Sequence, residues 1–173
     1  MAHYIDNKLF LQNMISYKEE IMTAKTNGTE KPKIPDYAAV AFMKIAENLS
    51  HKPNFINYSF RDEMVADAIE NCVMYCANFD PAKSSNPFAY FTQIVYYAFL
   101  RRIAKEKKEL YVKYKSTEMI GLTDGFEMNE ADDGTMFRQF DMYENISEFI
   151  ENFEVAQKQK KQAKKDKNLS LED

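Results

Sequence analysis

The sequence predicts an all-α protein, with one compact helical domain followed by a helical, acidic C-terminal extension. Only four Gly and five Pro occur among the 173 residues, which leaves little material for the many turns of a β-rich fold. Apolar residues recur at three- and four-residue spacing along most of the chain, as they do in helices that bury one face. A chain of this length can build one domain with a hydrophobic core.

Two helices are predicted in the first part of the chain. Apolar side chains recur at helical spacing from Asn7 to about Lys25, and Gly28 and two prolines then break the pattern. Asp36 is expected to cap the second helix, which ends near Ser50.

A third helix is predicted from Arg61 to Asn78, and it is amphipathic. Its apolar face carries Met64, Val65, Ala68, Ile69, Cys72, Val73 and Cys76. Its other face carries Glu63, Asp67, Glu70, Asn71 and Met74. On periodicity alone, that second face is a solvated surface.

A fourth helix is predicted to open at Pro87, after a turn, and to run to about Lys115. The residues that share its apolar side are Phe91, Ile94, Val95, Ala98, Phe99 and Ile103. The residues that follow one another on its other side are Gln93, Tyr97, Arg101, Lys105 and Lys108.

The predicted domain covers residues 1–118, and an acidic segment broken by glycines, residues 119–134, reads as a linker. A fifth helix is predicted over residues 135–165, with an aromatic and apolar stripe from Phe137 to Phe153 whose packing partner the sequence leaves open. From Gln157 onward the apolar content is too low for independent folding, so this end is expected to fray. Residues 166–173 form the predicted tail.

The net charge of −4 hides an uneven distribution. Basic residues dominate from Arg101 to Lys115, carboxylates from Asp124 to Glu154, and lysines from Lys158 to Lys167. The chain is therefore not attracted to nucleic acid uniformly, although single segments of it are suited to that contact.

The residues give no support for catalysis, a metal or a cofactor. The sequence contains no glycine-rich phosphate loop and only two histidines, so we expect no catalytic residue and no enzyme activity. Cys72 and Cys76 lie one helical turn apart on an apolar face, which favours core residues over a metal site that includes His51. Two cysteines cannot form a disulfide framework, and no leader or membrane-spanning pattern is visible, so a reduced, cytosolic protein is expected.

The outer side of the fourth helix has the chemistry of a nucleic-acid surface. Cations neutralise phosphates, and Gln or Arg side chains can contact base edges. Tyr90, Tyr96 and Tyr97 cannot all be buried on one face, and exposed rings beside cations can hold unstacked bases. A core helix that ends in a solvated basic face explains the same spacing equally well.

The strings "FRDEMVADAIENCVMYCANFDP" and "NPFAYFTQIVYYAFLRRI" resemble region 2 of the sigma-70 family of bacterial RNA polymerase initiation factors. The resemblance covers about Tyr37 to Lys108. The small size, the strings "NPFAYFTQ" and "RIAKEKKE" and the acidic C-terminal part are similar, more narrowly, to late-transcription sigma factors of T-even-type phages. The resemblance implies a sigma factor that binds host core RNA polymerase, recognises short A/T-rich, -10-like late promoters and helps to melt them in the host cell cytoplasm.

The resemblance also implies roles for individual residues. The set Glu63, Asp67, Glu70, Asn71 and Met74 would dock on the clamp helices of the polymerase β' subunit. The set Tyr90, Gln93, Tyr96, Tyr97, Arg101, Lys105 and Lys108 would contact promoter DNA, with one of the tyrosines receiving flipped bases. The adjacent tryptophans typical of the family are absent, and either Ile94 with Val95 or Tyr96 with Tyr97 stands near their place.

The phage relatives carry a short acidic and apolar C-terminal peptide that binds the DNA sliding clamp. Here Leu169, Leu171 and Glu172 are similar in kind but lack an aromatic residue, and a late co-activator is a further implied partner. The alternative interpretation is a helical interaction protein that binds RNA polymerase as an anti-sigma factor or inhibitor.

Overall fold

The computed structural model describes residues 4–119 and 135–169, with the side chains of residues 135–144 and 167–169 excepted. Within these residues the regular structure is entirely helical and contains no strand, which confirms the predicted all-α class. The elements are α1 (Asn7–Asn27), α2 (Asp36–Ser50), α3 (Arg61–Tyr75), the short 3-10 helix η1 (Cys76–Asn78), α4 (Pro87–Met119) and α5 (Thr135–Leu169).

The chain divides into two compact units, Met1–Ala104 and Lys105–Asp173. The division falls inside α4, so this helix contributes its first part to one unit and its last part to the other. The predicted domain limits at residues 118, 134 and 165 stay predictions.

The two ends of α1 are fixed by its flanking residues. The Asp6 carboxylate accepts hydrogen bonds from the backbone N–H groups of Lys8 (2.8 Å) and Leu9 (3.2 Å), which would otherwise lack partners at the helix start. Gly28 ends the helix in the left-handed conformation at φ 67°, where a side chain would be strained. The predicted break at Gly28 is thus confirmed.

The start of α2 differs from the prediction. Asp36 is the first helical residue, Pro35 occupies the capping position, and no side chain caps the helix. At the first turn, the Asp36 carboxylate is still placed where a helix dipole favours negative charge. The nearby Tyr37 hydroxyl instead ties α2 to the chain before α1, since it accepts from the Asp6 N–H (3.0 Å) and donates to the Asp6 carbonyl (3.1 Å).

The core of the first unit is an aromatic cluster around Phe91 of α4. The Phe91 ring is fully buried and lies 4.5 Å from that of Phe42 and 5.5 Å from that of Phe10, centroid to centroid. Phe79 and Tyr90 complete the cluster at 6.1 and 5.1 Å. One side chain therefore contacts rings from α1, α2 and the turn after η1, so it holds all of these elements on α4.

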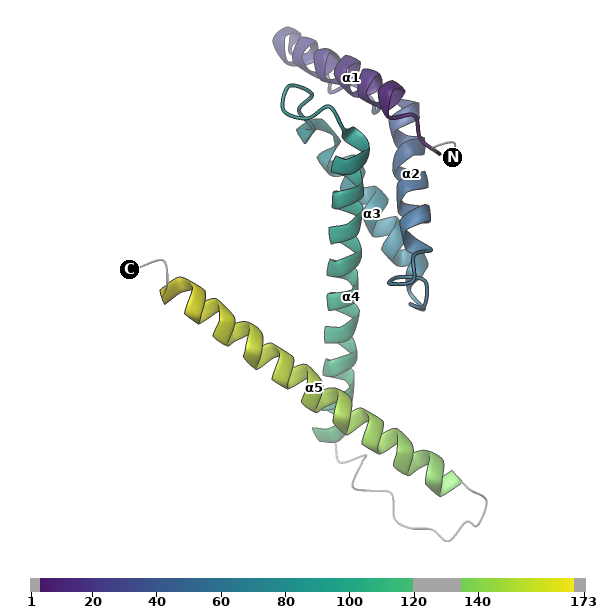
Figure 1. Cartoon of the computed structure of the whole chain (residues 1–173), viewed down its shortest axis with the longest axis vertical. Helices are drawn as coiled ribbons and strands as arrows, with labels where there is room; N and C mark the ends of the chain where they lie inside the picture. Colours follow the sequence, from purple (N-terminus) through teal and green to yellow (C-terminus); the bar gives the residue numbers. More distant parts are fainter. Residues whose placement is uncertain (1–3, 120–134, 170–173) are drawn as a thin grey trace. The chain divides into compact units, whose positions relative to one another are not determined.

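Figure 1 shows how the helices of the first unit are arranged. Helix α1 lies across one end of the group formed by α2, α3 and the first part of α4, at the end where α2 and α4 begin and α3 finishes. The buried residues that α4 contributes to this core are Pro87, Phe91, Val95, Ala98 and Phe99. The predicted apolar side of the fourth helix is thus confirmed, with Ile94 and Ile103 partly buried at its margins.

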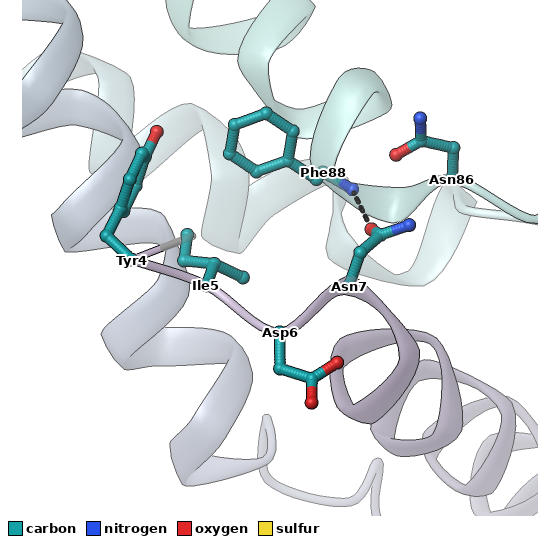
Figure 2. A pocket seen from close by; sticks show the side chains of 6 residues that line it. All are labelled: Tyr4, Ile5, Asp6, Asn7, Asn86 and Phe88. Carbon is teal, nitrogen blue, oxygen red and sulfur yellow. Dashed lines mark hydrogen bonds between the residues drawn. The ribbon is translucent and has the colours of Figure 1, made fainter. Parts of the chain in front are cut away.

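The first turn of α4 is capped twice. The Asn86 side-chain oxygen accepts from the Ala89 N–H (3.0 Å). The Asn7 side-chain oxygen accepts from the Phe88 N–H (3.2 Å), as Figure 2 shows. Because Asn7 is the first residue of α1, this second bond joins the starts of two helices. Tyr4, Ile5 and Asp6 line the small pocket beside these caps.

Helix α3 is shorter than predicted, and one of its predicted core residues is exposed. The α-helix ends at Tyr75, and Cys76 to Asn78 continue as η1. Val73 retains 43% of its accessible surface, because it lies on the side of α3 away from the buried Met64, Ala68 and Cys72. The prediction that placed Val73 on the apolar face was therefore wrong.

In the second unit, α5 packs on the last part of α4. The Phe153 ring stacks on Tyr111 at 4.5 Å, Phe149 meets Tyr114 edge to face at 5.6 Å, and Ile146 and Ile150 are buried. These contacts give the C-terminal half of the predicted aromatic stripe its partner. The side chains of Phe137, Phe140 and Tyr143 lie outside the described residues.

Polar contacts support the same packing. The Tyr111 hydroxyl donates to a Glu154 carboxylate oxygen at 2.9 Å, and the Lys115 ammonium lies 3.6 Å from that oxygen. The hydrogen bond from Tyr111, together with the positive charge of Lys115, lowers the pKa of the Glu154 carboxyl.

Helix α5 continues past this packed stretch to Leu169, whereas fraying was expected from Gln157. Ala, Gln and Lys are good helix formers, so a helix already held at residues 146–154 can extend through them without a core of its own. None of the helices in the described part of the chain is long and apolar enough to span a membrane.

Truncation of Phe91 tests the aromatic cluster. Phe91→Ala should lower the free energy of unfolding by about 3–5 kcal/mol, because it leaves a cavity lined by rings from three other elements. Tyr97→Ala on the same helix, where the side chain is 51% exposed, should change it by less than about 0.5 kcal/mol. Urea unfolding followed by circular dichroism measures both, and similar losses for the two variants would contradict the role of Phe91.

Candidate nucleic-acid interface

The predicted outer side of α4 is exposed in the first unit. Burial of Phe91, Val95 and Phe99 fixes the rotation of the helix about its axis, and residues two positions away point out of the core. Gln93, Tyr97 and Arg101 are accordingly exposed and follow one another at four-residue spacing. An amide, a phenol and a guanidinium therefore form one row on the surface.

This row borders a shallow pocket between α4 and the end of α3. The pocket measures about 270 Å³ and is lined by Tyr75, Tyr90, Gln93, Ile94, Tyr97 and Arg101. Aromatic rings supply much of its lining, while Gln93 and Arg101 bring hydrogen-bond donors that can reach a base edge or a phosphate. Its chemistry suits a flat, unstacked base next to a negative backbone.

Tyr90 is the least accessible of the three predicted tyrosines. Its ring packs on Phe79 at 5.3 Å and on Phe91 at 5.1 Å, and burial raises the pKa of its phenol. Tyr90 therefore serves as a floor of the pocket that is anchored in the core, and it can offer a bound base only part of its ring.

Tyr96 and Tyr97 are adjacent, exposed rings. Tyr96 is 41% and Tyr97 51% exposed, and their centroids lie 5.8 Å apart with the planes at 72°. Tyr96 also leans on the buried Phe55, at 5.9 Å, and it does not line the pocket that Tyr97 lines. Of the two pairs near the place where the sigma resemblance would put tryptophans, this is the accessible one, because Val95 is fully buried.

Side chains of α3 and α4 meet along a polar seam beside the pocket. The Arg101 guanidinium donates to the Asn71 side-chain oxygen at 2.8 Å, and Arg102 lies 3.5 Å from the Asp67 carboxylate. Asn71 in turn donates to the Asp67 carbonyl at 2.6 Å. A residue predicted to face DNA, Arg101, is thus bonded to one predicted to face polymerase, Asn71.

The predicted polymerase-facing set divides into two groups. Glu63, Glu70 and Met74 are exposed on α3, with Met74 at 58%. Asp67 and Asn71 are half-buried because they form the seam with α4. The exposed group is the part of α3 that a partner protein can reach directly.

The remaining predicted DNA-binding residues belong to the second unit. Lys105 and Lys108 are exposed on α4, and the Lys105 ammonium lies 3.9 Å from the Glu109 carboxylate one turn further on. This pair is solvent-exposed on both sides, so water and salt screen it strongly.

Tyr75 lines the pocket although sequence reasoning did not select it. Asp67, Asn71 and Tyr75 are spaced by four residues, so they form one row along α3. The helical spacing could have placed Tyr75 beside Asn71. That this row faces α4 follows only from the contacts of Asp67 and Asn71 with the two arginines.

Three clamp-binding residues were predicted, Leu169, Leu171 and Glu172. Leu171 and Glu172 lie outside the described residues, and for Leu169 only its place at the end of α5 is described.

No protein-family model matches the chain, and neither does any curated protein sequence.

The two cysteines lie in the core of the first unit. Burial raises the pKa of the Cys72 thiol to about 12 and that of Cys76 to about 11, so both stay protonated near neutral pH. In the described part of the chain, no three His, Cys, Asp or Glu residues are grouped so that they could hold a metal ion.

The buried thiols should react slowly in the folded protein. A rise of the pKa from 9.0 to about 11 or 12 reduces the thiolate fraction at about pH 8 by roughly a hundredfold or more, and burial slows the reagent further. Labelling with an aromatic disulfide reagent, with and without urea, measures this difference. Fast labelling without urea would show that the thiols are accessible.

The same pKa shifts should make stability depend on pH. In the unfolded chain the thiols ionise near pH 9.0, whereas in the folded protein Cys76 ionises near pH 11 and Cys72 near pH 12. The contribution of the protonated thiols to the free energy of unfolding is therefore complete below pH 9.0, and it is lost as the pH rises from 9.0 to these folded values. Urea unfolding at several alkaline pH values, compared with the Cys72→Ala variant, measures the contribution of Cys72.

Proposed function

We propose that this protein is a sigma factor of the region 2 type. It binds bacterial core RNA polymerase and directs it to short A/T-rich promoters of late phage genes, in the cytoplasm of the host cell. The observation that carries the proposal is the row of Gln93, Tyr97 and Arg101 along one aromatic pocket, next to the exposed acidic residues of α3. The resemblance to sigma region 2 places DNA and polymerase contacts at these same two positions.

The pocket supports a mechanism in which recognition and melting are coupled. A base that leaves the duplex loses its stacking neighbours, and Tyr97, with Tyr96 beside it, offers rings that replace them. A/T-rich elements unstack most easily at TA steps, so the energy of opening itself favours such sequences. Gln93 and Arg101 would contact base edges or phosphates at the edge of the opened segment.

The seam supports communication between the two surfaces. Arg101 has five N–H donors, and Asn71 accepts from one of its nitrogens. A partner that docks on Glu63, Glu70 and Met74 would therefore contact α3, the helix whose Asn71 positions the Arg101 side chain. Asp67 contributes to docking indirectly, because its carboxylate faces Arg102.

The proposal includes two further partner proteins that would strengthen promoter binding. Such a small pocket reads few bases, so the proposed sliding-clamp contact of Leu169, Leu171 and Glu172 and a late co-activator would strengthen promoter binding. Deletion of residues 168–173 should abolish clamp-stimulated transcription and leave basal transcription intact. Stimulation that survives the deletion would remove the clamp contact from the proposal.

Polymerase binding tests the α3 surface. The double variant Glu63→Lys, Glu70→Lys should weaken binding to core RNA polymerase by about tenfold or more, because like charges across an interface are strongly unfavourable. Both residues are exposed, whereas reversal of Asp67 would also break its ion pair with Arg102. Fluorescence titration of labelled protein with core enzyme measures the affinity.

The control is Glu19→Lys, Glu47→Lys, which changes exposed residues of α1 and α2 and alters the net charge equally. Equal weakening in both variants would mean that net charge and not the α3 surface governs binding. If the wild-type protein binds core enzyme but yields no promoter-specific transcripts, it is a polymerase inhibitor or anti-sigma factor, and the sigma proposal is wrong.

Promoter opening tests the aromatic pocket. Tyr97→Ala should reduce open-complex formation on duplex promoters by about 5- to 150-fold, since one stacked base contributes about 1–3 kcal/mol. The reduction should be smaller on templates that are already melted, where the cost of unstacking has been removed. Tyr97→Phe keeps the ring and should behave like the wild type, and equal losses on both kinds of template would exclude base trapping by Tyr97.

A further inference from the structure

The part of α5 that lies beyond its packing on α4 is strongly cationic. Residues 155–166 contain five lysines and one aspartate, a net charge of +4 in a chain whose total is −4. All five lysine side chains are exposed. We call their shared side the lysine face, and it consists of Lys158, Lys160, Lys161, Lys164 and Lys165.

These lysines gather on one side of the helix. At 3.6 residues per turn they fall within an arc of roughly 160°, and Gln159, Ala163 and Asp166 lie opposite. The same side of α5 carries Ile150 and Phe153 further upstream, where it packs on α4. One continuous face therefore changes from apolar to cationic along the helix.

A merely solvated helix does not explain this pattern. Solvated helices gain from opposite charges four residues apart, and Lys158 has such a partner in Glu154. Further along, however, Lys160 faces Lys164, and Lys161 faces Lys165, at the same spacing. The helix dipole favours cations in the last turn only, and α5 ends at Leu169. The Asp166 carboxylate accepts a hydrogen bond from Gln162 on its own side of the helix.

We propose that the lysine face binds the phosphate backbone of duplex DNA without regard to sequence. A major groove about 12 Å wide admits an α-helix, and lysines spread over a wide arc can reach phosphates on both of its walls. Bound phosphates would relieve the repulsion between the lysines. The site goes beyond the proposed function, because it needs neither polymerase nor an A/T-rich element.

An anionic membrane fits this segment less well. Helices that lie in a membrane surface insert large apolar side chains opposite their cations. The apolar residues of this segment are only Val155, Ala156 and Ala163, so it has no such face. The lysine face is therefore a backbone-binding surface that keeps the protein on DNA while other contacts select the sequence.

The test uses the full chain and labelled duplex DNA without an A/T-rich element, in a series of salt concentrations. The five residues of the lysine face are replaced together by Gln, which forms helices as well as Lys does. At about 0.1 M salt the affinity should fall at least about tenfold, and the slope of log K against log salt should shrink by up to about 4.5, since each of the five phosphate contacts contributes about 0.9. Fluorescence anisotropy measures binding, and circular dichroism confirms that the helix content is kept.

The matched control replaces five exposed lysines of the first unit by Gln and should lose less than about threefold. These residues are Lys8, Lys31, Lys33, Lys44 and Lys52. If both variants lose the same affinity for DNA, net charge and not the lysine face explains the binding, and the proposal is wrong. If the lysine-face variant keeps its affinity, the site is excluded. Stronger binding to phosphatidylserine vesicles or to single-stranded RNA than to the duplex would also overturn the proposal. Because polymerase is absent, each result stands apart from the sigma proposal.

Discussion

Burial of Phe91 is the constraint on which the first unit depends. Its ring touches aromatic side chains from α1, α2 and the turn after η1, so it fixes both where α4 lies and how that helix is rotated. With the rotation fixed, Gln93, Tyr97 and Arg101 have to face outward, since helical geometry leaves them no other direction. The candidate interface is thus a consequence of core packing, and its residues require no separate folding element.

The polar seam between α3 and α4 connects the helix with the predicted polymerase-facing residues to the helix with the predicted DNA-facing residues. Asp67 and Asn71 of α3 pair with Arg102 and Arg101 of α4, in opposite order along the two helices. Asp67, Asn71 and Arg102 are half-buried in these pairs, whereas Arg101 is exposed. The other residues of the predicted polymerase-facing set are exposed, namely Glu63, Glu70 and Met74.

One side of helix α5 changes from aromatic to cationic along its length. Around Phe153 the face is aromatic and packs on Tyr111, and from Lys158 onward the same side is cationic and exposed. Glu154 lies where the chemistry changes, with its pKa lowered by the Tyr111 hydroxyl and by the charge of Lys115. Packing of the first stretch holds the helix, so the second can project lysines that would not sustain a helix through their own interactions.

The sequence by itself determined the all-α class, the start of α4 at Pro87 and the inward side of that helix, because periodicity and proline placement are local properties. It placed Val73 inside and Asp36 as a cap, and both were wrong because burial and capping depend on what neighbouring elements leave open. Only the tertiary structure decided that Tyr75 joins the pocket, that Tyr90 is mostly a core ring, and that Arg101 is held by Asn71. The pocket, the Phe79–Tyr90 contact and the Asn71–Arg101 bond join residues eleven or more positions apart, and no local pattern records such contacts.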